Sequence, residues 1–375
     1  MPDWEVEADA GWDDWVASQT EAIRRAGRWR KLRPLEGGGP RFDLQYGSGS
    51  VVSFASNDYL GLSQHPDVNA AAARALERYG SGSGSSRLIV GDRPLHHELE
   101  RALAEWRGAE AALVFPTGYQ ANLAAMTTFG AGARIVSDEL NHASLIDGAR
   151  LAKADVAVYR HGDVEQAGWL VSSAEGRALV VSDTVFSMDG DAAPVGPLSE
   201  MCARHGALLV LDDAHLVFPT EEPDPDAEVV RIGTLSKALG SMGGYIAARG
   251  EWIELLINRA RSFIFTTGLA PSCAAAASEA LRICRSDEGS LLRKRLREHV
   301  DTMRPDNPSP IVPLVVGSEE AALEASERLL SQGLLVPAIR PPTVPVGTSR
   351  LRVSLSAAHD PADVARLCHA LTEFR

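Results

Sequence analysis

Short apolar runs alternate with longer helical stretches through the middle of the chain. Six runs rich in Val, Leu, Ile and Ala predict strands at residues 111–115, 133–138, 156–160, 178–183, 207–213 and 229–234. Because each run is apolar along most of its length rather than at every second position, it is typical of a strand buried on both faces of a parallel sheet. Helices must then cover both faces. The middle of the chain is therefore predicted to form a large α/β domain.

The pattern changes after Pro305. It predicts a strand at 311–316, a helix at 319–333, strands at 334–339 and 350–356, and a helix at 361–374. This βαββα order is typical of a compact α+β unit. We therefore place a large domain at 49–285 and a small C-terminal domain at 286–375.

The first 48 residues form a third segment. They contain four of the seven tryptophans and a cluster of six basic residues at 24–33. This composition predicts an amphipathic helix that docks onto the rest of the protein and ends at the glycine-rich residues 37–40. A Gly/Ser tract at 80–86 has Ala-rich helical sequence on both sides, so we interpret it as a functional loop rather than a linker.

Charge and composition exclude several classes of function. The 375 residues include 37 Lys+Arg against 50 Asp+Glu, for a formal charge of -13. This charge repels phosphate backbones and anionic lipids, so neither a nucleic acid nor a membrane is an expected partner. The acidic N-terminus lacks the features of a signal peptide, and no run reaches the roughly 18 apolar residues of a membrane helix. The expected location is the cytoplasm.

The cysteines indicate no metal site. Four cysteines lie far apart and none has a C-x-x-C spacing, so we predict reduced thiols and no zinc cluster. Complete G-x-G-x-x-G and G-x-x-x-x-G-K-[ST] motifs are also absent, which leaves dinucleotide and triphosphate binding without support.

Candidate chemistry lies where predicted strands end, since ligands of open α/β sheets bind at the carboxyl ends of strands. The first such place is VFPTGYQANLAAM at 114–126, a strand, a turn and a helix start. Free N–H groups at the helix start, with Thr117 and Gly118, would bind a phosphate. An ordinary strand-to-helix turn is the alternative.

The second place is Asp212, at the end of a predicted buried strand and three residues before His215. A buried carboxylate is costly unless it meets a cation, and a protonated pyridine nitrogen is such a cation. Capping of a helix by Asp213 is the alternative, but it leaves Asp212 unexplained.

The third place is Lys237, in the loop of RIGTLSKALGSMGG at 231–244. A lysine there can attach covalently to a carbonyl cofactor, with Thr234 and Ser236 as further phosphate donors. His142 follows another strand, where its ring could stack on an aromatic cofactor. Taken singly, Lys237 is compatible with a solvated surface lysine and His142 with an ordinary loop histidine. The combination is more specific than any of its members.

With these residues taken together, the sequence resembles the α-oxoamine synthases, which are pyridoxal 5'-phosphate enzymes of fold type I. The resemblance covers nearly the whole chain and lies above all in residues 53–66, 85–100, 114–125, 141–152, 182–194, 234–244, 263–272 and 340–359. It implies the aminotransferase-like fold, with a large mainly parallel-sheet domain and a small C-terminal α+β domain. It also implies a homodimer with the active site at the interface.

The resemblance further implies roles for residues around the cofactor. Lys237 would hold the cofactor and move a proton, Asp212 would pair with the pyridine nitrogen, and His142 would stack on the ring. Of the remaining cofactor contacts, Ser187 and His215 would lie at the phenolic oxygen, and Gly118 and Tyr119 at the phosphate. Thr234 would contact the phosphate or the neighbouring lysine, and Thr266 and Thr267 would reach the phosphate of the partner subunit.

Substrate residues follow from the same resemblance. Asn57 and Arg352 would bind the amino acid carboxylate, and Arg30 and Thr343 would line the path of the acyl substrate. Arg350 and Arg352 alternate with apolar residues in RLRVSLS and so share a strand face. Arg350 is therefore an alternative carboxylate ligand, and a further alternative is that both arginines are surface charges. His215 is a candidate donor to the acyl carbonyl oxygen.

The implied reaction is a decarboxylative condensation of L-alanine with a pimeloyl thioester, carried on CoA or on a carrier protein, as in biotin biosynthesis. Two alternatives stay open: a family member with a different amino acid or thioester, and a catalytically silent relative. One segment departs from the family pattern. After His215 the chain reads LVFPTEEPDPD (216–226), with Leu216 in place of an expected glycine and several residues fewer before Lys237.

Overall fold

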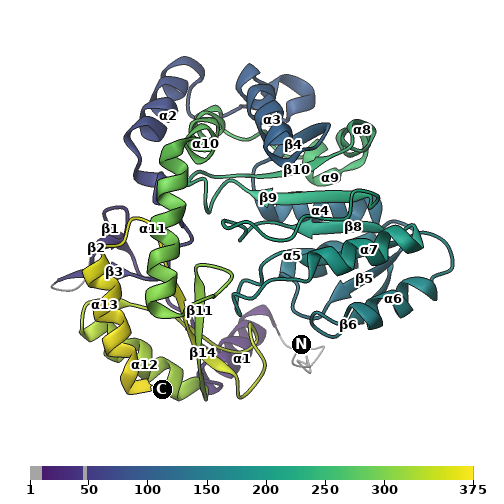
Figure 1. Cartoon of the computed structure of the whole chain (residues 1–375). Helices are drawn as coiled ribbons and strands as arrows, with labels where there is room; N and C mark the ends of the chain where they lie inside the picture. Colours follow the sequence, from purple (N-terminus) through teal and green to yellow (C-terminus); the bar gives the residue numbers. More distant parts are fainter. Residues whose placement is uncertain (1–10, 45–48, 375) are drawn as a thin grey trace.

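A computed structural model of the chain describes residues 11–44 and 49–374 (Figure 1). Its centre is a seven-stranded sheet in the order β4 (Ala111–Phe115), β10 (Gly244–Ala248), β9 (Val229–Thr234), β8 (Leu208–Asp212), β7 (Ala178–Asp183), β5 (Arg134–Asp138) and β6 (Asp155–Tyr159). Neighbouring strands from β9 to β6 are parallel, and β10 is antiparallel to β4 and β9. All six predicted strands are present. β10 was not predicted.

Helices cover both faces of this sheet. α4 (Gly118–Phe129), α5 (Ala143–Ala152), α8 (Gly250–Arg259) and α9 (Arg261–Ile264) pack on one face, and α6 (Val164–Ser172) and α7 (Val195–His205) pack on the other. Successive residues of one strand enter opposite cores: Leu179 and Val181 contact the first helix layer, and Val180 contacts the second. The predicted α/β class is confirmed. Burial on both faces was wrong for β6, which lies at the edge of the sheet and leaves Val156 and Val158 exposed.

A second sheet joins three strands from residues 35–53 with one strand at residues 334–335. β1 (Leu35–Glu36), β2 (Arg41–Leu44) and β3 (Ser50–Ser53) are antiparallel, and β12 (Leu334–Leu335) adds to β3 in parallel. The predicted N-terminal helix, α1 (Trp12–Arg25), ends well before the glycine-rich turn. The segment after it docks onto the C-terminal part through an Arg28–Glu319 ion pair of 2.8 Å and a 2.9 Å hydrogen bond from Arg340 to the Gly27 carbonyl.

The third sheet has the order β11 (Ile311–Gly317), β14 (Ser349–Ser354) and β13 (Ala338–Ile339). Around it lie α11 (Asp287–Met303), α12 (Glu319–Ser331), α13 (Pro361–Ala370) and the 3-10 turn η3 (Leu371–Phe374). The prediction of one strand at 334–339 was wrong. Pro337 lacks an N–H and interrupts the ladder, so β12 and β13 pair into different sheets. Our domain boundaries at 48 and 285 stay a prediction.

The remaining helices lie beside β4 and β10. They are η1 (Leu62–Gln64), α2 (Pro66–Tyr79), the π-helical turn η2 (Arg87–Gly91), α3 (Pro94–Arg107) and α10 (Pro271–Cys284). The Gly/Ser tract at 80–86 is tied to the core, because buried Ser83 donates a 2.6 Å hydrogen bond to the Leu269 carbonyl. It is an ordered loop that leads into η2. Across the described residues, no helix has the length and apolar character needed to cross a bilayer.

Candidate active site

A pocket opens at the carboxyl ends of β8 and β9, beside the N-terminus of α4. It brings together five of the predicted residues from four separate segments: Gly118, His142, Asp212, His215 and Lys237. Thr117, Tyr119, Thr234 and Ser236 also line it. These residues are up to 120 positions apart in the chain. The parallel sheet brings them together, because the carboxyl ends of its strands meet at one edge.

The start of α4 forms one end of the pocket. Thr117 caps the helix by accepting a 3.1 Å hydrogen bond from the Gln120 N–H. A Cβ on Gly118 would lie 3.4 Å from the Thr234 Cβ, and a Cβ on Gly244 would lie only 2.5 Å from the Gly118 Cα. The missing side chains leave the backbone N–H groups of the helix start accessible. Such a start binds anions through these groups and the helix dipole.

Asp212 also lines the pocket, with 5% of its surface exposed. Its carboxylate accepts a 2.7 Å hydrogen bond from the Asn122 amide and a 3.0 Å bond from the Ala214 N–H. No Lys, Arg or His side chain of the described residues forms an ion pair with it, in contrast to neighbouring Asp213, which pairs with Arg231 at 2.9 Å. Asp212 is thus a buried carboxylate that faces the pocket and requires a cation.

Lys237 and His215 are in direct contact. The lysine Nζ lies 2.8 Å from His215 Nε2, and His215 Nδ1 lies 2.6 Å from the Tyr59 hydroxyl. Burial lowers the pKa of Lys237 to about 8, although the carboxylates of Asp212 and Asp183 act in the opposite direction. Burial also lowers the pKa of His215, and the positive charges of Lys237 and Arg352 add to this effect. The pocket therefore contains a neutral imidazole beside a lysine that loses its proton easily.

His142 is held at the start of α5. Its Nδ1 lies 2.7 Å from the Ser144 hydroxyl, which accepts a 2.8 Å hydrogen bond from the Asn122 amide. Since Asn122 also bonds Asp212, one network fixes both the histidine and the carboxylate. Burial lowers the pKa of His142, so its ring is neutral near pH 7. A neutral aromatic ring is suited to stacking on a flat ligand.

Two arginines on β14 differ in their partners. Arg350 is paired with the Asp189 carboxylate. Arg352 donates to the Ser187 carbonyl, to the Ser354 hydroxyl at 2.7 Å and to the Asn57 side-chain oxygen at 3.3 Å, all of them neutral groups. Within the described residues, Arg352 is therefore a buried cation without a carboxylate partner, and only 5% of its surface is exposed. Such a group favours binding of an anion.

Other predicted residues lie outside the pocket lining. Ser187 reaches the site through its carbonyl, which accepts the Arg352 Nε–H. Thr266 accepts a 3.1 Å hydrogen bond from Gln120 of its own chain, and Thr267 follows it in the loop after α9. Arg30 and Thr343 are exposed on the N-terminal and C-terminal segments. The roles of these five residues toward cofactor, substrate or partner subunit stay predictions.

The segment that departs from the family pattern leads away from the pocket. Ala214 and His215 line the pocket, but none of residues 216–226 does. Val217 and Phe218 instead pack against the core, with the Arg297 guanidinium 4.2 Å from the centre of the Phe218 ring. The shortened segment therefore leaves the walls of the site intact.

Sequence reasoning missed three residues that support the site: Tyr59, Asn122 and Ser144. Tyr59 lies in the stretch 53–66 that carries the resemblance, but no spacing distinguishes it as a partner of His215. Asn122 lies on α4, one turn beyond Gly118, and a polar residue on the buried face of a helix is the signal that could have identified it.

Comparisons with known proteins agree with this geometry. Residues 49–371 match the family described as aminotransferase class I and II. The chain belongs to this family. It is 45% identical to an 8-amino-7-oxononanoate synthase of Anaeromyxobacter dehalogenans, over 96% of this chain and 94% of that protein. A Burkholderia cenocepacia protein of the same name is 49% identical, over 86% and 88% of the two chains.

Two solved structures show the same architecture. A serine palmitoyltransferase from S. paucimobilis with bound PLP has a TM-score of 0.88 and 28% identity, and the match covers 96% of each chain. An 8-amino-7-oxononanoate synthase from Francisella tularensis has a TM-score of 0.73 and 23% identity, over 86% of this chain and 97% of that one. The fold type and the resemblance stated from the sequence are confirmed.

Proposed function

We propose that this chain catalyses the decarboxylative condensation of L-alanine with a pimeloyl thioester, with pyridoxal 5'-phosphate as cofactor. The observation that carries the proposal is the position of Lys237, which contacts the neutral imidazole of His215 in a pocket that also contains the unpaired carboxylate of Asp212. The names of relatives at 45–49% identity support the reaction.

The residues present fit pyridoxal phosphate. The start of α4 with Gly118 would hold the phosphate, Asp212 would pair with the pyridine N–H, and the His142 ring would lie on the ring face. The buried Asp212 carboxylate lacks a cation among the described residues, and the protonated pyridine would supply it. When bound, the cofactor supplies an electron sink for the charge that forms at the alanine Cα.

Lys237 would act as the base that removes the alanine Cα proton. A pKa near 8 lets its Nζ exist as a free amine in part of the molecules at neutral pH and return as an ammonium after taking a proton. His215 Nε2 lies 2.8 Å from Nζ, so the imidazole would hold the lysine amine in place within the pocket. His215 is buried and Lys237 is half-buried, so access of bulk water to this step is limited.

Arg352 would bind the alanine carboxylate and orient the Cα–H bond toward Lys237. Three of its five N–H groups are used by neutral acceptors, and the remaining two are available for a carboxylate. Asn57, whose oxygen bonds Arg352, adds an amide donor nearby. The alternative ligand, Arg350, is already paired with Asp189.

His215 would donate to the carbonyl oxygen of the thioester during acylation. The Tyr59 hydroxyl lies 2.6 Å from Nδ1 and 3.2 Å from the Asn57 side-chain oxygen. Donation of its one proton at the shorter contact, to Nδ1, would leave the ring proton on Nε2. Burial raises the pKa of Tyr59 to about 12, so this hydroxyl keeps its proton at neutral pH. A hydrogen-bond donor aimed at a developing oxyanion is among the strongest contributions to acyl transfer.

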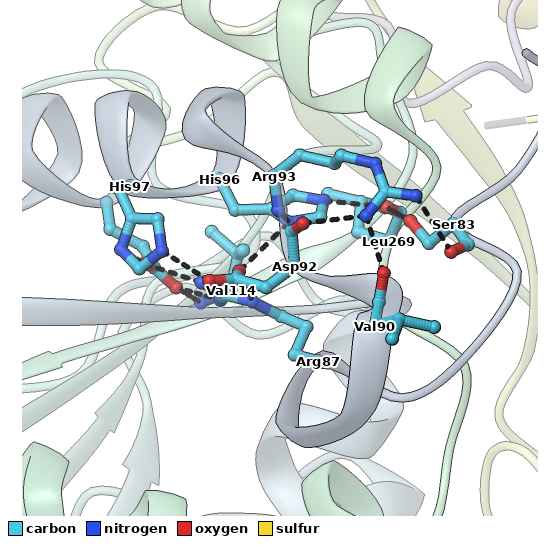
Figure 2. Close-up of polar contacts among 10 residues, drawn as sticks. Ser83, Arg87, Val90, Asp92, Arg93, His96, His97, Val114 and Leu269 are labelled. Atoms are coloured by element: carbon cyan, nitrogen blue, oxygen red, sulfur yellow. Dashed lines mark hydrogen bonds and ion pairs between the residues drawn. The ribbon is translucent and has the colours of Figure 1, made fainter. Parts of the chain in front are cut away.

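The assembly we propose is a homodimer. Three consecutive aliphatic side chains on η2, Leu88, Ile89 and Val90, are 50%, 73% and 67% exposed. Ion pairs anchor this turn: Arg87 pairs with Glu100, and also with Asp92 at 2.7 Å. Figure 2 shows Arg87 and Asp92 beside the turn. An ordered apolar surface of this kind is typical of a protein interface, and a second copy of the chain is the occupant the proposed family assembly requires.

One observation supports a different amino acid substrate. The chain is also similar to a serine palmitoyltransferase of solved structure, at 28% identity and a TM-score of 0.88. A synthase that uses another amino acid or thioester is therefore the second candidate.

A cytoplasmic location remains our proposal, supported by the absence of disulfides among the cysteines of the described residues.

The test supplies purified holoenzyme with alanine, serine or glycine and with thioesters of several chain lengths, and identifies each product by mass. We expect the highest kcat/KM for alanine with a pimeloyl thioester. A clear preference for serine or glycine would support the second candidate, and no product from any pair would refute catalysis.

A further inference from the structure

His161 lies just beyond β6 and contacts two carboxylates from different elements. Its Nδ1 lies 3.1 Å from Asp138 at the end of β5, and its Nε2 lies 2.6 Å from Asp191. The ring edge also packs on Phe186, with centroids 4.4 Å apart at 89°. A carboxylate only accepts hydrogen bonds, so each ring nitrogen must carry a proton. The contacts therefore describe an imidazolium between two anions.

Asp191 closes a tight turn at residues 186–191. The Phe186 N–H donates to the Asp191 carbonyl at 3.0 Å, and the Gly190 N–H donates to the Phe186 carbonyl at 2.8 Å. Gly190 has φ 72° and packs so closely that an added Cβ would lie 2.2 Å from the Ile311 carbonyl oxygen. A turn this tightly packed transmits a displacement of either end to the other.

The same turn holds the two β14 arginines. The Ser187 carbonyl accepts from Arg352 Nε, and Asp189 pairs with Arg350. The Gly190 carbonyl also accepts a 2.6 Å hydrogen bond from Ser309, just before β11. The turn therefore connects the central sheet with the β11–β14 sheet, and the direction of the Arg352 guanidinium depends on where the turn lies.

We propose that His161 is a positioning residue: as a permanent imidazolium it clamps the 186–191 turn to β5 through Asp191 and Asp138, and thereby orients Arg352 toward the carboxylate of the amino acid substrate. This inference rests on the proposed function, because it concerns the affinity of that site for an amino acid. His161 itself contacts neither the pocket lining nor Arg352.

Every charged group near His161 is consistent with the charged form. Asp138 and Asp191 face the ring nitrogens, and Glu139 accepts the backbone N–H of His161 at 2.9 Å. Arg160 and Asp163 of its own turn pair with each other at 2.5 Å. Hydrogen bonds to the two facing carboxylates raise the pKa of His161 to about 10. The clamp is thus expected to stay closed across the neutral range.

The first test reads the protonation of His161 directly. The holoenzyme is labelled with 15N-histidine, and the signal lost in His161→Gln assigns the residue; Asp191→Asn provides a second assignment, by a shift of the same signal. We expect both ring nitrogens to be protonated at pH 8, where an ordinary histidine is neutral. A neutral His161 ring at pH 8 would overturn the proposal.

The second test measures amino acid affinity without turnover, by titrating the cofactor absorbance of holoenzyme with alanine, or with whichever amino acid the wild type binds. His161→Gln should raise the half-saturating concentration about 10-fold, because a displaced turn moves Arg352 from its binding geometry. The KM for the thioester should stay within about 2-fold of the wild type, since that substrate does not use Arg352. His161→Arg keeps the charge and two donors and should restore most of the affinity.

His205→Gln, on the exposed end of α7, is the matched control and should change nothing. An unchanged amino acid affinity in folded His161→Gln would refute the positioning role. Equal losses for both substrates, with no recovery in His161→Arg, would indicate general destabilisation and would also refute it. Neither readout needs a condensation product, so failure of the proposed reaction would be seen separately.

Discussion

Replacement of Arg352 by lysine tests how the site recognises an amino acid. Three N–H groups of Arg352 donate hydrogen bonds, to the Ser187 carbonyl, the Ser354 hydroxyl and the Asn57 side-chain oxygen. A guanidinium has five N–H groups, so one remains on each terminal nitrogen. Two donors in a fixed planar fork match the two oxygens of a carboxylate. Lysine keeps the charge but has a single nitrogen on a flexible chain.

The size of the effect follows from the hydrogen bonds that lysine cannot reproduce. Arg352→Lys should lose at least one hydrogen bond to a charged group, worth about 1.5–3 kcal/mol. Since about 1.4 kcal/mol corresponds to a tenfold change in binding, the Kd for alanine should rise roughly 10- to 150-fold. The KM for the thioester should change little, because the acyl group does not contact this arginine in the proposed arrangement.

The assay titrates the cofactor absorbance with alanine in the absence of thioester and is repeated with Arg350→Lys as the matched variant. Arg350 is equally buried but paired with Asp189, so its replacement should affect folding stability more than alanine affinity. Circular dichroism and thermal unfolding establish that both variants fold. An unchanged alanine Kd in Arg352→Lys, or a larger loss in Arg350→Lys, would refute the assignment.

Three further predictions concern the lysine, its neighbour and the apolar turn. Lys237→Ala should fold but lose turnover by several orders of magnitude. Borohydride reduction of the wild type should label Lys237 alone. The rate at which wild-type apoprotein binds the cofactor should increase as the pH rises through about 8, because a larger fraction of the Lys237 amine is then neutral. Tyr59→Phe removes a 2.6 Å contact with His215 worth about 0.5–1.5 kcal/mol, so kcat at saturating substrates should fall roughly 2- to 10-fold, and an unchanged kcat would exclude a role for the hydroxyl. Ile89→Asp should give a monomer by light scattering with low activity, whereas a dimer of normal activity would show that the interface lies elsewhere.

The strands of the central sheet were predictable because burial on both faces leaves a continuous apolar run in the sequence. β10 has the sequence GYIAA, in which two alanines and a glycine replace the branched residues that mark a strand. The run at 334–339 looked like one strand, and nothing local shows that its halves join different sheets. Pairing of this kind depends on partners hundreds of residues away.

Several residues that line the pocket were predictable for a related reason. Asp212 directly follows a run of apolar residues, and burial of a carboxylate in that position costs free energy unless a cation pairs with it. Asn122 and Tyr59 hold Asp212 and His215 in place, but their positions follow from side-chain contacts between separate elements. Alternation and spacing in the sequence indicate which residues lie on the same face of a strand or helix. They do not indicate which side-chain atoms come into contact.

Arg350 and Arg352 show where that boundary lies. Alternation on β14 correctly sends Leu351 and Val353 to the core and both arginines to the other face, and by that measure the two arginines are equivalent. The turn at 186–191 separates them, because it offers Asp189 to one and only a carbonyl to the other. A buried cation that is already paired gains little from a second anion, whereas an unpaired one is stabilised by the first anion it meets. In the proposed arrangement, selectivity for the substrate carboxylate would therefore depend on the partners that the 186–191 turn supplies to the two arginines.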